Sequence, residues 1–260
     1  MERNATSPLV NPVEDLMLFL QSETAACGGE LAKARDYNRR AIDTVLRAGG
    51  KEGPSEYQAH GAVREALFGN SELAIEEAHA ALARARGKHV DAFSAIALGL
   101  AGETKEAERL ADELSRHFPE DTIVRFDYLP MIHAAIALRE GNPARAIEHL
   151  EACAPYELGH TNPTFTFALY PVYLRGLAYL AAGRGDAAAK EFQKIVDQRG
   201  VVGNEPIGAL ARLGLGRSYV LSGDVARAKG AYQQFFLLWK NADPDLRLLG
   251  QAKAELAKVE

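Results

Sequence analysis

The chain has 260 residues, of which 47% are hydrophobic and 25% charged, and its formal net charge is −5. This balance is that of a globular protein with a sizeable core. The acidic charge disfavours a nucleic-acid-binding protein, because binding to a phosphate backbone requires a basic face. Two cysteines are too few for a disulfide framework, and neither stands in a metal-binding pattern. No apolar run is long enough for a membrane span.

Six helical hairpins and a final helix are predicted along the chain. Residues 1–11 are polar, lack the pattern of a signal peptide, and are predicted to form a flexible lead-in. The hairpins are expected at 12–48, 55–87, 89–118, 122–154, 164–199 and 204–241, within a repeat array that covers 12–241. The last segment, 242–260, is predicted to be a helix that caps the open end of the array. Asp243 and Pro244 are predicted to start that helix as its N-cap and first residue.

The hairpins are predicted from a pattern that occurs six times. Each copy has a small anchor residue, a glycine seven positions later and an alanine twelve positions later. The anchors are Ser22, Ala62, Ala95, Ala134, Gly176 and Gly216, and the glycines are Gly29, Gly69, Gly102, Gly141, Gly183 and Gly223. Each glycine is expected to end the first helix of its hairpin in a left-handed conformation, which carries no Cβ penalty. Asn142 and Asp224 are expected to cap the second helix of their hairpins.

This pattern resembles the tetratricopeptide repeat, although the anchors are 33 to 42 residues apart instead of the usual 34. Tryptophan is absent from its usual early position, and Asn38 stands in the first copy where an aromatic residue or leucine is typical. The resemblance implies an all-α fold, a right-handed α-α superhelical solenoid of about six helix hairpins plus the C-terminal capping helix. It also implies a protein-binding function.

A second resemblance extends over nearly the whole chain. It rests on FPEDTIVRFDYLP, APYELG, ALYPVYLRGLAYL, EFQKIVDQRG, VGNEPIGALARLGLGRSY and FFLLWKNADPD. These stretches are similar to the C-terminal repeat region of bacterial, especially acidobacterial, serine/threonine protein kinases. The resemblance implies a scaffold or sensor region and a kinase domain in cis as a candidate partner. The chain itself has no glycine-rich phosphate loop, H-R-D or D-F-G motif, so no kinase activity is expected.

The concave face of such a solenoid is lined by the first helix of each repeat. By this resemblance, the predicted protein-binding residues are Tyr128, Met131, Tyr170, Tyr173, Leu177 and Arg217. An apolar, tyrosine-rich groove suits an amphipathic helix or an extended peptide. The alternative interpretation is that these side chains pack within the solenoid. The first three repeats offer a more polar stripe with Glu23, Glu56 and His89, whose charges are expected to be solvated.

Two long connections, Pro155–Pro163 and Gly200–Pro206, are predicted to be surface loops or, alternatively, functional segments. If the first connection is a functional segment, Phe165 and Phe167, just beyond it, are exposed or fold back into the groove. No HExxH or G-x-S-x-G motif occurs, so neither a catalytic site nor a cofactor or metal is predicted. His133, which precedes an anchor on a helix, is expected to be a packed or capped histidine.

The sequence therefore predicts a non-catalytic protein- or peptide-binding module. The alternative is a structural element that self-associates through the helix near Leu246, so both a monomer and a homodimer are open. The default location is the cytoplasm, and the periplasmic side of a membrane-anchored kinase is the alternative.

Overall fold

The computed structural model describes residues 13–50, 52–159 and 168–259. Within these ranges the chain forms α-helices joined by turns, with no strand. The predicted lead-in at 1–11 lies outside the described residues, as do Phe165 and Phe167.

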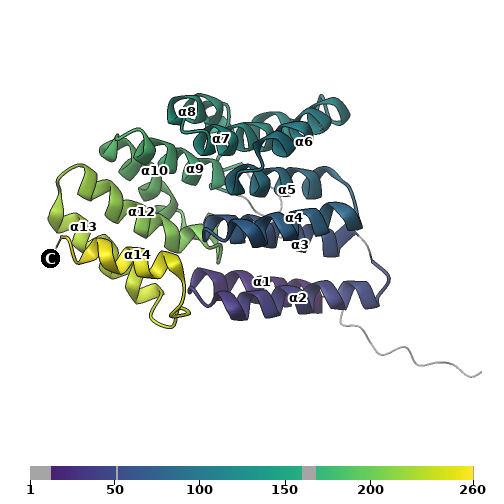
Figure 1. The fold of residues 1–260 in the computed structure, drawn as a ribbon, viewed down its shortest axis with the longest axis horizontal. Helices are drawn as coiled ribbons and strands as arrows, with labels where there is room; N and C mark the ends of the chain where they lie inside the picture. Colours follow the sequence, from purple (N-terminus) through teal and green to yellow (C-terminus); the bar gives the residue numbers. More distant parts are fainter. Residues whose placement is uncertain (1–12, 51, 160–167, 260) are drawn as a thin grey trace, which may run out of the picture.

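In the described part of the chain, six helix hairpins follow one another in the order predicted from the sequence, and the all-helical fold class is confirmed. The pairs are α1 (Glu14–Cys27) with α2 (Leu31–Arg47), α3 (Glu52–Leu67) with α4 (Ser71–Arg84), α5 (Lys88–Ala101) with α6 (Thr104–His117), α7 (Leu129–Arg139) with α8 (Pro143–Glu151), α9 (Tyr170–Ala181) with α10 (Gly185–Asp197), and α12 (Ile207–Leu221) with α13 (Val225–Leu238). A π-helical turn (Val124–Tyr128) precedes α7, a 3-10 turn (Ala154–Tyr156) follows α8, and the short α11 (Arg199–Val202) precedes α12. Successive hairpins lie side by side in the ribbon (Figure 1).

The repeated glycines and alanines have the roles that the pattern predicts. The six glycines at the hairpin turns all have positive φ, between 72° and 113°. The six alanines five positions later, Ala34, Ala74, Ala107, Ala146, Ala188 and Ala228, are all 0% exposed. A left-handed residue without a Cβ ends one helix, and a small residue then lets the second helix pack closely against the first.

Both predicted helix caps are also confirmed. The Asn142 side chain accepts a hydrogen bond from the Arg145 backbone N–H at 3.2 Å, and Asp224 accepts one from the Arg227 N–H at 2.9 Å. Each bond satisfies one of the N–H groups that a helix start leaves without an intrahelical partner.

The last helix, α14 (Arg247–Leu256), starts later than predicted. Its N-cap position is Leu246, so the prediction that Asp243 and Pro244 begin this helix is wrong. The Asp243 carboxylate instead accepts a hydrogen bond of 2.7 Å from the backbone N–H of Ala32, in the first turn of α2. A free N–H from a distant helix lies within reach of this carboxylate, and that contact replaces the local cap.

The array curves back so that its last hairpin touches its first (Figure 1). Trp239, at the end of α13, donates its indole N–H to the carbonyl of Cys27 at 3.1 Å and stacks on Phe68 with ring centroids 5.5 Å apart. Asp243 donates its backbone N–H to the Gly29 carbonyl at 3.1 Å. We call these contacts the ring closure. In this closed arrangement the inner faces of the first helices of the hairpins are largely buried.

Candidate functional site

An arc of aromatic rings connects the first helices of the hairpins. Phe19 of α1 stacks on Tyr57 of α3 at 4.8 Å and meets the edge of His60 at 4.9 Å. Phe93 of α5 continues the arc, 6.1 Å from His60 and 5.7 Å from Tyr128 in the π-helical turn. Edge-to-face and stacked pairs of this kind stabilise a packed interior beyond the area that they bury.

Five of the six residues predicted to bind a partner lie on these inner helices, and Tyr128 lies in the π-helical turn before α7; most of the six are not accessible. Tyr128, Met131, Tyr170 and Tyr173 are at most 6% exposed. Their burial agrees with the alternative interpretation, in which they pack within the solenoid. Leu177 and Arg217 are half-buried. Binding through these six residues remains a prediction, and for the first four it requires the interior to open.

A buried group of polar side chains lies where the first, second, fifth and sixth hairpins meet. We call it the inner polar cluster, and its members are Ser22, Glu23, His60, Arg64, Tyr170 and Glu205, all at most 7% exposed. Ser22 and Glu23 lie on α1, His60 and Arg64 on α3, Tyr170 on α9, and Glu205 in the turn before α12. The cluster therefore joins segments from both ends of the array.

Arg64 holds one end of the cluster. Its Nη1 donates to Glu23 Oε1 at 2.8 Å and to Ser22 Oγ at 2.7 Å, and the Ser22 hydroxyl donates to the carbonyl of Ala34 at 2.7 Å. The expectation that Glu23 is solvated is wrong: it is 2% exposed, because the fold places the Arg64 guanidinium beside it and so offsets its burial. The other two residues of the polar stripe are half-buried, and His89 Nδ1 lies 2.7 Å from the Tyr128 hydroxyl.

Tyr170 holds the other end by donating its hydroxyl proton to Glu205 Oε2 at 2.8 Å. The His60 ring stands between the two carboxylates, with Nδ1 3.6 Å from Glu23 Oε1 and Nε2 3.7 Å from Glu205 Oε1. Burial, followed by the charge of Glu23, raises the pKa of Glu205 well above its usual value. Burial lowers the pKa of His60. Two carboxylates thus share the interior with one guanidinium, and the excess negative charge requires a proton or a cation.

Three members of this cluster, His60, Arg64 and Glu205, were not singled out from the sequence. Glu205 belongs to Gly200–Pro206, which the sequence marks as an unusually long connection. In the structure that segment contains the end of α11 and brings Glu205 into the interior, so it is not simply a surface loop. The unusual length of this connection is the sequence feature that indicates a role for Glu205.

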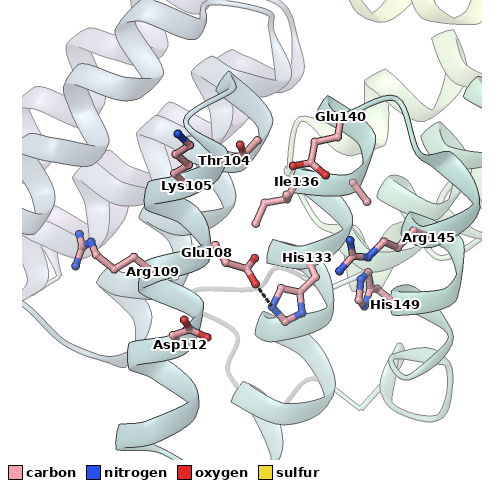
Figure 2. A pocket seen from close by; sticks show the side chains of 11 residues that line it. Thr104, Lys105, Glu108, Arg109, Asp112, His133, Ile136, Glu140, Arg145 and His149 are labelled. Atoms are coloured by element: carbon pink, nitrogen blue, oxygen red, sulfur yellow. Dashed lines mark ion pairs between the residues drawn. The ribbon is translucent and has the colours of Figure 1, made fainter.

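The outer face carries a groove of about 460 Å³ between α6, α7 and α8. Figure 2 shows Glu108 of α6 and His133 of α7 pointing toward each other, with 4.0 Å between Oε1 and Nε2. The rings of His133 and His149 lie 5.1 Å apart, and burial lowers the pKa of His149. Acidic and basic side chains alternate along the walls, so the groove has no single charge sign that would select a ligand.

The repeat assignment is supported independently for the last two hairpins. Residues 173–241 match the tetratricopeptide repeat family. Two copies of the pattern, anchored at Gly176 and Gly216, lie within this tetratricopeptide match. A tetratricopeptide repeat protein from Parabacteroides merdae ATCC 43184, known from a crystal structure, is 12% identical to the chain. The alignment covers 95% of this chain and 98% of that one with a TM-score of 0.37. No curated protein matches the chain in sequence.

None of the helices that the structure describes is long and apolar enough to cross a membrane.

Proposed function

We propose that the chain is a non-catalytic scaffold that binds a protein or peptide, as tetratricopeptide arrays do. The observation that supports this function is an accessible remainder of the inner face on the C-terminal halves of α9 and α12. We call it the C-terminal ledge, and it consists of Leu177, Leu180, Arg217 and Val220. Val220 is 43% exposed, and the other three are half-buried. Apolar side chains around an arginine are typical of the contact region of a protein interface.

The edge of this ledge favours a partner with an acidic residue. Arg217 donates to both carboxylate oxygens of Glu255 on α14, each at 2.9 Å, which fixes the guanidinium beside the apolar side chains. The pair is about 30% exposed, so a carboxylate from a partner can replace Glu255. We therefore expect an amphipathic or extended segment whose apolar side chains flank an aspartate or glutamate.

A matched pair of variants tests the ledge. Val220→Asp places a charge on it, whereas Leu237→Asp places the same charge on α13 at a residue that is 71% exposed and outside the ledge. With the chain immobilised and bound proteins identified by mass spectrometry, Val220→Asp should lose a reproducible partner that Leu237→Asp retains. A partner retained by both variants would refute this surface. Tyr173→Ala is unsuitable as a probe, because Tyr173 is only 6% exposed and its truncation would disturb the core.

Binding through the buried tyrosines would have a distinct signature. Contact with Tyr128 or Tyr170 requires the first helices to separate, and the separation would break the ring closure. Trp239 is the chain's single tryptophan and is 3% exposed at that closure. A shift of its emission to longer wavelength on adding the partner would support binding in an opened interior, and unchanged emission would restrict binding to surfaces such as the ledge.

The resemblance to kinase repeat regions supports a kinase domain in cis as the partner, with the array in the cytoplasm by default or on the periplasmic side of a membrane-anchored kinase. The kinase domain of a full-length relative, added as a separate chain, is the direct bait. Binding that Val220→Asp weakens and Leu237→Asp preserves would support this partner, and the absence of binding to such a domain would remove it.

Self-association is the second candidate function. Exposed apolar side chains on α13 favour it: Val225, Leu237 and Leu238 are 52%, 71% and 40% exposed. Such side chains are a candidate contact between two copies. Light scattering distinguishes the two functions, because a monomer at high micromolar concentration excludes self-association. A dimer that Leu237→Asp dissociates would establish it.

A further inference from the structure

We propose that the inner polar cluster binds one divalent transition-metal ion of the Zn²⁺ class through Glu23, His60 and Glu205. One ligand atom from each of these buried residues can be chosen so that all three lie within 4.8 Å of one another. Two carboxylates and one imidazole form a ligand set that Zn²⁺ accepts, and further positions remain for the other ligands of a four- or five-coordinate ion. This inference does not depend on the proposed scaffold function.

The two carboxylates are held as metal-ligating carboxylates are usually held. Arg64 fixes Oε1 of Glu23 at 2.8 Å, and Tyr170 fixes Oε2 of Glu205 at 2.8 Å. In each case the other oxygen is left for the cluster. Glu23 is 2% exposed, and its Oε2 has no hydrogen-bond partner in the described part of the chain. Outer donors of this kind orient ligating carboxylates, and a buried oxygen without a donor is a position that a cation satisfies.

The charge of the cluster also favours a cation. Glu23 and Glu205 offer two negative charges, and Arg64 is the one permanently positive member. A divalent ion offsets the excess, which would otherwise be costly in a buried site. The competing occupant is a single proton shared between the two carboxyl groups, which each offer an oxygen within 4.8 Å of the other. Because metal must displace this proton, the affinity should fall as the pH is lowered.

The position of the ligands predicts what the ion would do. Glu23 belongs to the first hairpin and His60 to the second, whereas Glu205 precedes the first helix of the sixth. An ion bound to all three would tie the two ends of the array together. Metal binding should therefore stabilise the closed ring, since a ligand that binds only the closed form shifts the equilibrium toward it.

The test uses the full chain after removal of metal with a chelator. Zn²⁺ should bind at one equivalent per chain, survive gel filtration, raise the Tm and bind more weakly at pH 5.5 than at pH 7.5. Co²⁺ serves as the spectroscopic probe, because an imidazole and carboxylate ligand set gives it visible absorption bands. His60→Gln and Glu205→Gln should each abolish the bound equivalent and the Co²⁺ bands.

His149→Gln is the matched control, because it removes an imidazole from the outer groove next to His133 and leaves the inner polar cluster intact. Retention of the bound Zn²⁺ by this variant supports the proposal. Loss of binding in His149→Gln with retention in His60→Gln would overturn it and place the ion in the outer groove. An unchanged Tm with no retained Zn²⁺ would also overturn it and leave the shared proton as the occupant. Circular dichroism identifies a variant that fails to fold, and Glu205→Gln, a neutral isostere, then decides the outcome.

Discussion

Replacing Gly29 with alanine should disrupt the contact between the first and last hairpins, whereas the same change at Gly141 should not. Both glycines end the first helix of a hairpin in the left-handed conformation, with φ of 77° and 74°. They differ in their surroundings. A Cβ at Gly29 would lie 2.6 Å from the Cβ of Ala242 and 2.8 Å from Cδ2 of Trp239, whereas a Cβ at Gly141 would meet nothing within 4 Å.

The magnitudes follow from this difference. The left-handed conformation costs a non-glycine residue about 1–2 kcal/mol, and both variants incur that cost. Gly29→Ala adds a steric overlap worth about 1–3 kcal/mol, unless Trp239 and Ala242 move away and the ring closure opens. For a chain of this size each kcal/mol corresponds to a Tm change of roughly 2–4 °C. Gly29→Ala should therefore lower the Tm more than Gly141→Ala does.

Tryptophan emission is the assay that separates strain from opening. Trp239 is the chain's single tryptophan, stacked on Phe68 and hydrogen-bonded to Cys27, so its emission reports the ring closure directly. Gly29→Ala should shift the emission to longer wavelength, and Gly141→Ala should leave it unchanged. Equal losses of Tm in the two variants, with unchanged emission in both, would refute the packing argument at Gly29.

Three further predictions concern single side chains. Burial raises the pKa of Asp127 to about 7 in the folded chain. Between about pH 4 and pH 7 the folded chain therefore keeps a proton on Asp127 that the unfolded chain has lost. The contribution of Asp127 to the free energy of unfolding should accordingly fall as the pH rises through this range. Asp127→Asn should accordingly be more stable than the parent at pH 8 by on the order of 1–3 kcal/mol and show a smaller gain at pH 5, measured by urea unfolding at both pH values. Asp243→Ala removes the carboxylate that caps α2 and should cost about 1 kcal/mol in the same assay, and no loss would show that water replaces the cap. Phe192→Ala should cost about 3–5 kcal/mol, because the ring is fully buried between Gly176 and Gly214; a loss below 1 kcal/mol would contradict such close packing.

Local residues determined the hairpins and their ends. A glycine in the left-handed conformation and a capping Asn or Asp act within one turn of the chain, so Gly183, Asn142 and Asp224 could be assigned from their neighbours alone. The burial of the six repeated alanines could be predicted from their fixed distance to these glycines, because helical spacing determines which face of a helix meets the next helix. Even Asn38, which departs from the repeat pattern, is buried at its expected position and donates to the carbonyl of Tyr57.

The tertiary structure alone decided what the inner face contains. The contacts that define it join residues far apart in the chain: Arg64 with Glu23, Tyr170 with Glu205, and Trp239 with Cys27, the last pair separated by 212 positions. Such contacts depend on the small rotation between successive hairpins, which accumulates over six repeats and brings the last one back to the first. Asp243 also shows that local sequence cannot predict such long-range contacts. Its position before Pro244 is typical of an N-cap, but the backbone N–H that it binds belongs to α2. A local pattern specifies each turn, whereas the summed rotation of all the turns determines whether the inner face stays open or is buried.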